Sequence, residues 1–295
     1  MPRIVSFLPA GTEMVHSLGA GSELVGRSHE CDYPSSVMLL PVVSRPSLVL
    51  DGASPEAIDL AVAQQMERGD TLYRIDEVLL RDLRPDVILT QNLCRVCAPS
   101  GDELTRAVRK FALQPEVLFL TPRSMGEIEA NIVEVGRAIG REKEAEAIVR
   151  SNKERLARVR AAVKNAPLRR VVFLEWTDPL FCGGHWVPEM ISLAGGEDPL
   201  GRPGEDSVRM EWDDVVNARP GVIIVSPCGY RLDRSIELAR QMRRVQGAEV
   251  YAVDANAYFA RPGPRVVEGV EILAHLFHPD LVSWPHANRP WQRVS

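Results

Sequence analysis

The sequence has no excess of positive charge and no long apolar run. The chain of 295 residues carries a formal net charge of −5, whereas nucleic-acid binding needs a basic patch that neutralises phosphates. No run approaches the roughly 20 apolar residues needed to cross a bilayer. With 45% hydrophobic and 25% charged residues, the composition is that of an ordinary globular protein. We therefore expect neither a nucleic-acid partner nor a membrane span.

Phosphate-binding loops and complete catalytic groups are also missing. The sequence contains no GxxxxGK[ST] motif, and the glycine pairs Gly183-Gly184 and Gly195-Gly196 lack the glycine spacing of a dinucleotide loop. His29 and Cys31 are only two residues apart in one expected loop, a poor basis for a nucleophile and its base. We therefore expect a binding protein and not an enzyme.

The N-terminus does not have the pattern of a signal peptide. Its apolar stretch is broken at Pro9 and Thr12, and it fits a strand, a turn and a helix with Thr12 as the N-cap. The sequence as it stands predicts a cytoplasmic location. An export signal upstream of Met1 would instead make the protein periplasmic or extracellular.

One long helix is expected from Arg141 to Ala166, between Gly140 and Pro167. The stretch contains no glycine or proline, and apolar or small residues recur at three- and four-residue steps. The members of this face are Ala145, Ile148, Val149, Asn152, Leu156, Val159 and Val163. At 1.5 Å per residue, about 25 residues would span about 37 Å, enough to connect two lobes.

Strand and helix patterns alternate on both sides of this helix. Each side opens with a short apolar strand flanked by arginine, Arg3 to Leu8 and Arg169 to Leu174. The sequence therefore predicts an α/β fold with an N-terminal lobe (1–140), a rigid connecting helix (141–166) and a C-terminal lobe (167–295).

The aromatic residues are few, but several follow the predicted strands. Only 6% of the chain is aromatic, and ligands in open α/β sheets bind at the loops after the carboxyl ends of strands. The aromatic residues in such loops are Tyr33, Trp176, Trp186, Tyr230, Tyr258 and Phe259. They predict a cleft for a large, flat and partly apolar ligand. For each of them the alternative is ordinary core packing.

Cysteines collect in the same loops. The chain has five, an odd number that does not suggest a disulfide framework. Cys31, Cys94, Cys97 and Cys228 come from three strand-end loops, and the C-x-x-C spacing of Cys94 and Cys97 suits zinc or an iron–sulfur cluster. His29 and His185 lie in neighbouring loops. The alternative is that free cysteines are small buried hydrophobic residues, which we expect for Cys182.

Four segments carry a family resemblance over nearly the whole chain. They are SFLPAGTEMVHSLGAGSELVGRSHECDYP, LRPDVI, VVFLEWTDPLFCGGHW with the later LAGG, and DANAYFARPGPRVVEGVEILAHL. Together they resemble the substrate-binding proteins of cobalamin and ferric-siderophore ABC transporters, the class III periplasmic binding proteins, with the cobalamin-binding branch nearest. The resemblance implies two Rossmann-like lobes, joined by one helix, that move little when a corrinoid binds in the cleft.

The resemblance also implies roles for individual residues. Tyr33, Trp176 and Phe259 with Arg261 match positions that line the corrinoid cleft. Asp76 and Asp213 match the acidic residues that dock to arginines of the membrane permease, with aspartate where the family usually has glutamate.

Two other hypotheses stay open from the sequence. One is a cytoplasmic protein, an enzyme among the options, that holds a metal or an iron–sulfur cluster on the cleft cysteines. The other is a heme or siderophore binder, for which Arg261 and Arg234 are the main candidates to bind carboxylates or catecholates. One thiolate or histidine could also serve as an axial ligand to a corrinoid cobalt.

Overall fold

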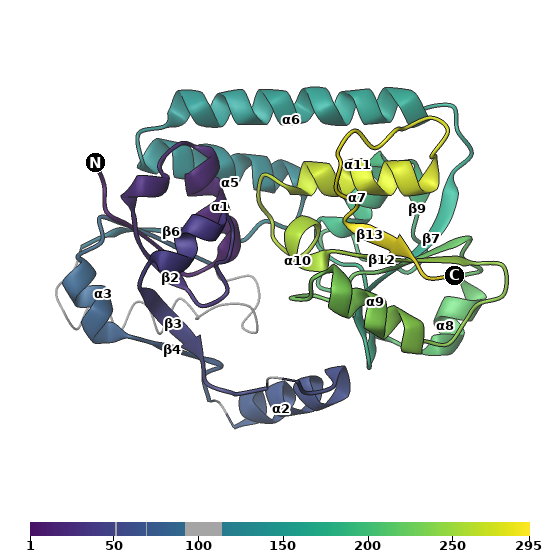
Figure 1. The fold of residues 1–295 in the computed structure, drawn as a ribbon, viewed down its shortest axis with the longest axis horizontal. Helices are drawn as coiled ribbons and strands as arrows, with labels where there is room; N and C mark the ends of the chain where they lie inside the picture. The colour runs from purple at the N-terminus through teal and green to yellow at the C-terminus, as the bar shows by residue number, and fades with distance from the viewer. Residues whose placement is uncertain (51, 69, 92–113) are drawn as a thin grey trace. The chain divides into compact units, whose positions relative to one another are not determined.

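The computed structural model describes residues 1–50, 52–68, 70–91 and 114–295. The chain divides into two compact units, unit 1 (Met1–Pro122 and Glu129–Val149) and unit 2 (Arg123–Ile128 and Arg150–Ser295). Each unit is an α/β structure with its own sheet (Figure 1), so the predicted two-lobe α/β fold is confirmed. Cys94 and Cys97 lie outside the described residues.

Two helices have residues in both units. The predicted long helix is α6 (Glu142–Val163), which begins in unit 1 and ends in unit 2. The preceding helix α5 (Met125–Ala138) begins in unit 2 and ends in unit 1. A Cβ added to Gly136 of α5 would lie 2.5 Å from the Cβ of Ala145. Glycine therefore allows α5 and α6 to pack closely within unit 1.

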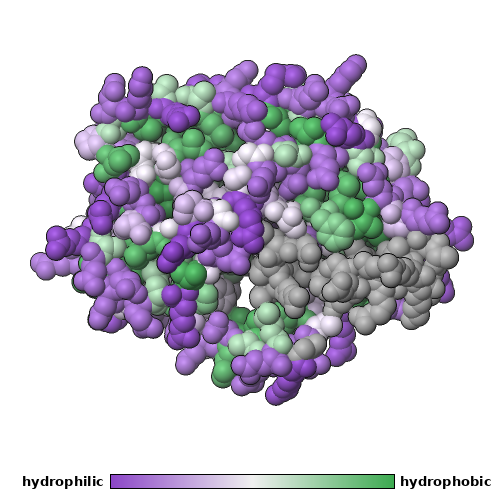
Figure 2. All heavy atoms as spheres, turned by 180° about the vertical axis from the view of Figure 1, so that it is seen from behind, coloured by the Kyte–Doolittle hydropathy of each residue, from purple (hydrophilic) through white to green (hydrophobic). Residues whose placement is uncertain are grey.

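The predicted face of α6 is the less exposed one. Ala145, Asn152, Val159 and Val163 are buried. Hydrophilic atoms cover the top edge of Figure 2, where α6 runs in Figure 1. In unit 2, the Arg155 guanidinium donates to Glu271 at 2.9 Å, and this hydrogen bond raises the pKa of Arg155 further.

The sheet of unit 1 is mostly parallel. Its described strands are β1 (Ile4–Ser6), β2 (Leu24–Ser28), β3 (Val42–Pro46), β4 (Tyr73–Ile75), β5 (Val87–Thr90) and β6 (Glu116–Phe119). Their order is β4-β3-β2-β1-β5-β6, and the edge strand β4 pairs with β3 antiparallel. Because the other pairings are parallel, the carboxyl ends of β1, β2, β3 and β5 lie at one edge of this sheet, and with them the described loops after β1, β2 and β3.

Unit 1 also contains helices, and α2 (Pro55–Glu67) among them extends away from its sheet (Figure 1). Besides α2 and the first part of α6, the described ones are α1 (Pro9–Ser17), η1 (Gly21–Glu23), η2 (Ser35–Leu39), α3 (Glu77–Leu83) and most of α5. Val5, Phe7, Val43, Leu80 and Ile88 form a buried cluster between the sheet and α3.

The prediction that Thr12 is an N-cap is wrong. Helix α1 begins four residues earlier, with Leu8 as the N-cap and Pro9 in the first turn. Proline fits this position because its fixed φ suits a helix and its missing N–H is not needed there. Thr12 therefore lies inside the helix, where its hydroxyl donates to the Cys31 Sγ at 3.0 Å.

The sheet of unit 2 is mixed. Its described strands are β7 (Arg169–Thr177), β8 (Leu180–Cys182), β9 (Gly196–Glu197), β10 (Arg209–Met210), β11 (Val222–Val225), β12 (Glu249–Val253) and β13 (Trp291–Arg293). The order is β10-β8-β7-β11-β12-β13, with β9 paired to β7. β7, β11 and β12 are parallel to one another, whereas β8 and β13 run antiparallel to their neighbours. β13 has no strong sequence pattern and was not predicted.

Helices lie on both faces of this sheet (Figure 1). The remaining described helices of unit 2 are α7 (Val187–Leu193), α8 (Trp212–Asn217), α9 (Leu232–Gln241), α10 (Ala255–Tyr258) and α11 (Val266–Phe277). Alternate residues of the strands, such as Val172 and Leu174, pack in one cluster with Val215 of α8 and Ala239 of α9. Among the described residues, no helix is long and apolar enough to cross a membrane.

A carboxylate fills a gap in the hydrogen bonding of β7. Asp198 accepts hydrogen bonds from the backbone N–H of Phe173 at 3.1 Å and of Leu200 at 2.9 Å. Burial nevertheless raises the pKa of Asp198 from 3.8 to about 6, because the charged form loses more hydration than these two donors replace.

Asp198 is therefore expected to make the stability of unit 2 depend on pH. Its protonated form is favoured in the folded state, so its contribution is full below about pH 3.8 and is lost as the pH rises through about 6. At about 1.4 kcal/mol per pH unit, the loss is about 3 kcal/mol. Asp198→Asn cannot titrate, so the unfolding free energy of wild type minus that of the variant should fall by this amount between pH 3.5 and 7 in urea titrations. A constant difference would contradict the raised pKa.

Candidate functional site

Three loops of unit 2 lie together at one edge of its sheet. The first comprises the last three residues of β7 and the start of the turn to β8 (175–178), the second is residues 226–230 after β11, and the third is residues 254–259, which follow β12 and include α10. Since β7, β11 and β12 are parallel neighbours, their carboxyl ends meet at this edge. This is the strand-end position where the sequence predicts a ligand.

Backbone hydrogen bonds link the three loops. The N–H of Cys228 donates to the carbonyl of Glu175 at 3.0 Å, which joins the second loop to the first. The N–H of Asn256 donates to the carbonyl of Tyr230 at 3.0 Å, which joins the third loop to the second. The positions of the side chains on these loops are therefore coupled.

Trp176 and Tyr230 form a stacked pair across the first two loops. Their ring centroids are 5.6 Å apart and their planes differ by 19°. The indole N–H of Trp176 donates to the carbonyl of Asp178 at 3.1 Å, and the guanidinium of Arg234 lies 5.9 Å from the centre of the Tyr230 ring. Both rings are only partly buried. They offer a flat, preformed surface on which a planar ligand can stack.

The other predicted aromatic residues of unit 2 are buried. Trp186 is 6%, Tyr258 8% and Phe259 2% exposed. The indole N–H of Trp186 donates to the carbonyl of Phe259 at 2.9 Å, and the Phe259 ring packs 5.5 Å from that of Phe173. In this structure these three residues are therefore core residues, which is the core-packing alternative.

Guanidinium groups surround the carboxylate at the end of β12. Asp254 caps α10 by accepting from the N–H of Ala257 at 2.9 Å. Burial raises the pKa of Asp254, and the nearby Arg265, Arg231 and Arg261 partly oppose this shift. Because the Glu268 carboxylate also interacts with Arg265, the charge of these three arginines is balanced in part by two carboxylates.

The predicted residues of unit 1 differ in their exposure to solvent. Tyr33, in the loop after β2, is 49% exposed. Cys31, two residues earlier, is fully buried, and its sulfur lies 3.0 Å from the Thr12 hydroxyl and 3.3 Å from that of Ser28. The centroid of the neighbouring His29 ring lies 5.7 Å from the centroid of the Tyr73 ring.

The described residues do not assemble the predicted metal site. They contain no group of three or more histidine, cysteine, aspartate or glutamate side chains that could hold an ion. Cys31 is buried in unit 1, whereas Cys228 is exposed in unit 2. His185 is paired with Asp206 at 3.0 Å. Because Cys94 and Cys97 lie outside the described residues, the four-cysteine site stays a prediction.

Both predicted docking aspartates are exposed at the beginning of a helix. Asp76 is the N-cap of α3, where its carboxylate accepts from the N–H of Leu79 at 2.9 Å. Asp213 lies in the first turn of α8, next to Trp212. Both carboxylates face solvent, as an ion pair with a partner would require.

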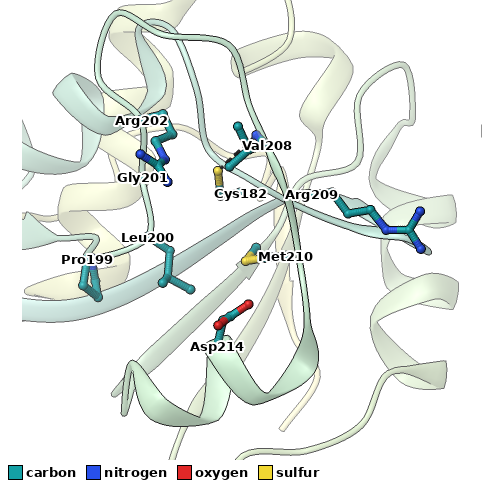
Figure 3. A pocket seen from close by; sticks show the side chains of 9 residues that line it. All are labelled: Cys182, Pro199, Leu200, Gly201, Arg202, Val208, Arg209, Met210 and Asp214. Atoms are coloured by element: carbon teal, nitrogen blue, oxygen red, sulfur yellow. Dashed lines mark hydrogen bonds between the residues drawn. The ribbon is translucent and has the colours of Figure 1, made fainter.

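A pocket in unit 2 lies away from the three loops. It has a volume of about 340 Å³, at the low end of the range for ligand pockets. Figure 3 shows the side chains of Cys182, Leu200, Met210 and Asp214 directed into it, whereas that of Arg209 points away. Burial raises the pKa of the Cys182 thiol, which keeps it protonated. As predicted, Cys182 is a buried packing residue.

The comparisons with known proteins decide the family. A model described as "Periplasmic binding protein" matches residues 4–252. The chain belongs to this family. Its members are the solute-binding proteins of ABC transporters and are not enzymes, so the recognition of the family and the expectation of a non-catalytic protein are both confirmed.

Two curated relatives match nearly the whole chain. The ABC transporter substrate-binding lipoprotein YvrC of Bacillus subtilis is 25% identical over 287 residues, which is 94% of this chain and 80% of YvrC. A vitamin B12-binding protein of Vibrio cholerae is 23% identical over 275 residues, 91% of this chain and 86% of that protein.

Two solved structures have the same fold. A periplasmic heme-binding protein from Pseudomonas aeruginosa superposes with a TM-score of 0.72 and 19% identity, covering 100% of this chain and 99% of that chain. The vitamin B12-binding protein BtuF of V. cholerae superposes with a TM-score of 0.66 and 20% identity, covering 94% and 97%. At this identity the similarity shows the fold and leaves the ligand open.

The cysteines of this periplasmic binding protein should differ strongly in reactivity. Cys228 is exposed, whereas Cys31 and Cys182 are at most 1% exposed. Alkylation by iodoacetamide, followed residue by residue with peptide mass spectrometry, should modify Cys228 at least about 100-fold faster, because a buried thiol reacts only after local opening. All three should react at similar rates in urea. Fast labelling of Cys31 in the folded protein would contradict its burial.

Proposed function

We propose that this protein binds cobalamin or a related corrinoid as the solute-binding component of an ABC uptake system. The observation that carries the proposal is the partly exposed stacked pair of Trp176 and Tyr230 on linked strand-end loops. A corrin ring is large, flat and apolar on its faces, so this pair could contact it without first being ordered. The relatives named as vitamin B12-binding proteins support the same ligand.

Other residues from the sequence analysis extend the proposed site. Arg261, whose charge acts on Asp254, is itself 6% exposed and is proposed to attract a polar group of the ligand through its charge. Tyr33 of unit 1 is proposed as a further contact, supported by its exposure in a loop after a parallel strand. Trp186, Tyr258 and Phe259 are proposed to act mainly by supporting the loops, since they are buried.

Heme is a second candidate because of the charge of the site. Heme carries two carboxylates on a flat ring, and the guanidinium groups of Arg231, Arg261 and Arg265 around Asp254 suit anionic groups. The structural relatives that bind heme support this alternative. The names of the relatives also support a location outside the cytoplasmic membrane, in the periplasm or as a lipoprotein.

Replacing Trp176, the partly buried tryptophan of the stacked pair, should show whether this pair contacts the ligand. The purified protein is expected to bind cyanocobalamin with a Kd of about 10 µM or tighter in calorimetric titrations. Trp176→Ala should weaken binding at least about 10-fold, because it removes the larger ring of the stacked pair. Trp212→Ala is the matched control: this residue is also partly buried in unit 2 but begins α8, and its loss should change the Kd by less than twofold.

A parallel titration with hemin distinguishes the two ligands. Binding of cyanocobalamin alone would support the proposal. Binding of hemin alone, lost in Trp176→Ala, would overturn the corrinoid proposal in favour of heme at the same site. Equal losses of cobalamin affinity in both tryptophan variants would show that the stacked pair is not the contact surface.

Asp76 and Asp213 are proposed to dock this protein to the permease. Asp213→Arg should leave the Kd for cyanocobalamin within twofold but lower transport by the reconstituted transporter at least about 10-fold, because it replaces attraction to a permease arginine by repulsion. Asp233→Arg is the matched control, an exposed aspartate in the first turn of α9, and should transport normally. Unchanged transport by Asp213→Arg would contradict the docking role.

A further inference from the structure

Strand β7 contains a β-bulge just before Trp176 of the stacked pair. Over this stretch, residues 174–177 of β7 lie opposite only residues 180–182 of β8, so Glu175 is the additional residue. A bulge of this kind inserts one residue into one strand and changes which face of the sheet the following side chains occupy. The paired residues are Leu174 with Cys182, Trp176 with Phe181 and Thr177 with Leu180.

The bulge decides the face of the sheet on which Trp176 lies. Residues that are opposite each other on paired strands share a face. Leu174 belongs to the buried cluster with α8 and α9, and Leu180, the partner of Thr177, packs against the same cluster. In a regular strand, the alternation of side chains would give Trp176 the same face as Leu174. With the bulge, Thr177 takes this position and Trp176 stacks on Tyr230.

Glu175 is fixed both by its side chain and by its backbone. Its carboxylate accepts a hydrogen bond from the backbone N–H of Gly184 at 2.9 Å. Its backbone carbonyl accepts from the N–H of Cys228 at 3.0 Å, the hydrogen bond that joins the first two loops. The additional residue of β7 is therefore held at two points, directly before the tryptophan of the stacked pair.

Gly184 belongs to a turn that has its own fixed position in unit 2. The N–H of His185 donates to the carbonyl of Glu205 at 2.7 Å, and the N–H of Gly204 donates to the carbonyl of His185 at 2.9 Å. A Cβ added to Gly184 would lie 2.5 Å from the backbone nitrogen of Ser207, so glycine is needed for the two segments to approach this closely. The carboxylate at the bulge is thus anchored to a backbone that is held in place from the other side.

The same turn connects the first loop to the third. Trp186, two residues after Gly184, donates its indole N–H to the carbonyl of Phe259 at 2.9 Å. The two backbone hydrogen bonds between the loops complete a closed ring of four hydrogen bonds. Glu175 accepts two of the four, one through its carboxylate and one through its carbonyl. Loss of its side chain would open this ring next to the stacked pair.

We propose that Glu175 is a positioning residue for the ligand site: the hydrogen bond from the Gly184 N–H to its carboxylate keeps the bulge in the form that places Trp176 against Tyr230. Glu175 acts through Trp176 and does not itself contact the ligand. A surface that already has its binding form loses little conformational entropy when the ligand arrives, so a loosened bulge should lower the affinity. This inference rests on the proposed function, because it takes the stacked pair as the contact surface.

Substitutions of Glu175 can separate its hydrogen bond from its charge. Glu175→Gln keeps the length of the side chain and an oxygen that accepts, but removes the charge. Glu175→Asp keeps the charge but is shorter by one methylene and should not reach Gly184. Glu175→Ala removes both. Glu189→Ala is the matched control, because this glutamate of α7 also accepts from a backbone N–H, that of Met125 at 2.8 Å, which lies in none of the three loops.

The first readout is hydrogen exchange without ligand, resolved to single amides by NMR. The amide of Gly184 reports the hydrogen bond to the carboxylate, and the amide of Cys228 reports the backbone of the bulge. Both should exchange at least about threefold faster in Glu175→Ala and Glu175→Asp, since one hydrogen bond is lost. Both should exchange at about the rate of wild type in Glu175→Gln and in Glu189→Ala.

The second readout is affinity for cyanocobalamin. Glu175→Ala and Glu175→Asp should weaken binding about 3- to 10-fold, whereas Glu175→Gln should keep the Kd within twofold of wild type. In the Trp176→Ala background, Glu175→Ala should have no further effect, because Glu175 acts through that ring. Glu189→Ala should leave the Kd within twofold.

The opposite order of affinities in Glu175→Asp and Glu175→Gln would show that affinity follows the charge, and would overturn the positioning role. Unchanged exchange at Cys228 in Glu175→Ala, or an equal loss of affinity in the Trp176→Ala background, would overturn it too. Failure of wild type to bind cyanocobalamin would overturn the proposed ligand. In that case faster exchange at Cys228 in Glu175→Ala would still support the ordering of the bulge, and unchanged exchange would reject it.

Discussion

The parallel pairing of β7, β11 and β12 is the constraint on which the candidate site depends. Parallel neighbours bring their carboxyl ends to the same edge, so residues separated by some 50 to 80 positions in sequence become neighbours in unit 2. Two backbone hydrogen bonds then tie the three loops to one another. Each is worth only about 1 kcal/mol, and together they favour one arrangement of the three loops.

At this edge of the sheet some aromatic side chains are accessible to a ligand, whereas others are buried in the core. The stacked pair is open enough to contact a ligand, whereas Trp186 and Phe259 are closed in the core and hold the loop backbone. At the end of β12, the arginines Arg265, Arg231 and Arg261 lower the pKa of Asp254 against the effect of its burial. The edge therefore offers an accessible aromatic surface on a backbone that buried residues hold in place.

Several features could be predicted from the sequence because they depend on local patterns. The recurrence of Ala145, Asn152, Val159 and Val163 predicts the buried face of α6, and the structure confirms it. At the beginning of α2, Ser54 accepts from the N–H of Ala57 and Pro55 lies in the first turn, a local pattern typical of a helix start. The prediction for Thr12 failed because Pro9 allowed the helix to begin earlier. β13 was missed because three residues with no apolar alternation gain strand structure only from pairing with β12.

What the sequence determined by itself is the alternation of strands and helices, the long helix α6 and the set of loops that carry aromatic residues, because each follows from the periodicity of neighbouring residues. Only the tertiary structure decided which of those aromatic residues are accessible. Trp176 lies near the end of β7 and Trp186 follows β8, yet one stacks near the surface and the other is buried. The physical reason is that burial depends on contacts between residues that are distant in the chain, such as the hydrogen bond from Trp186 to the carbonyl of Phe259, 73 positions later.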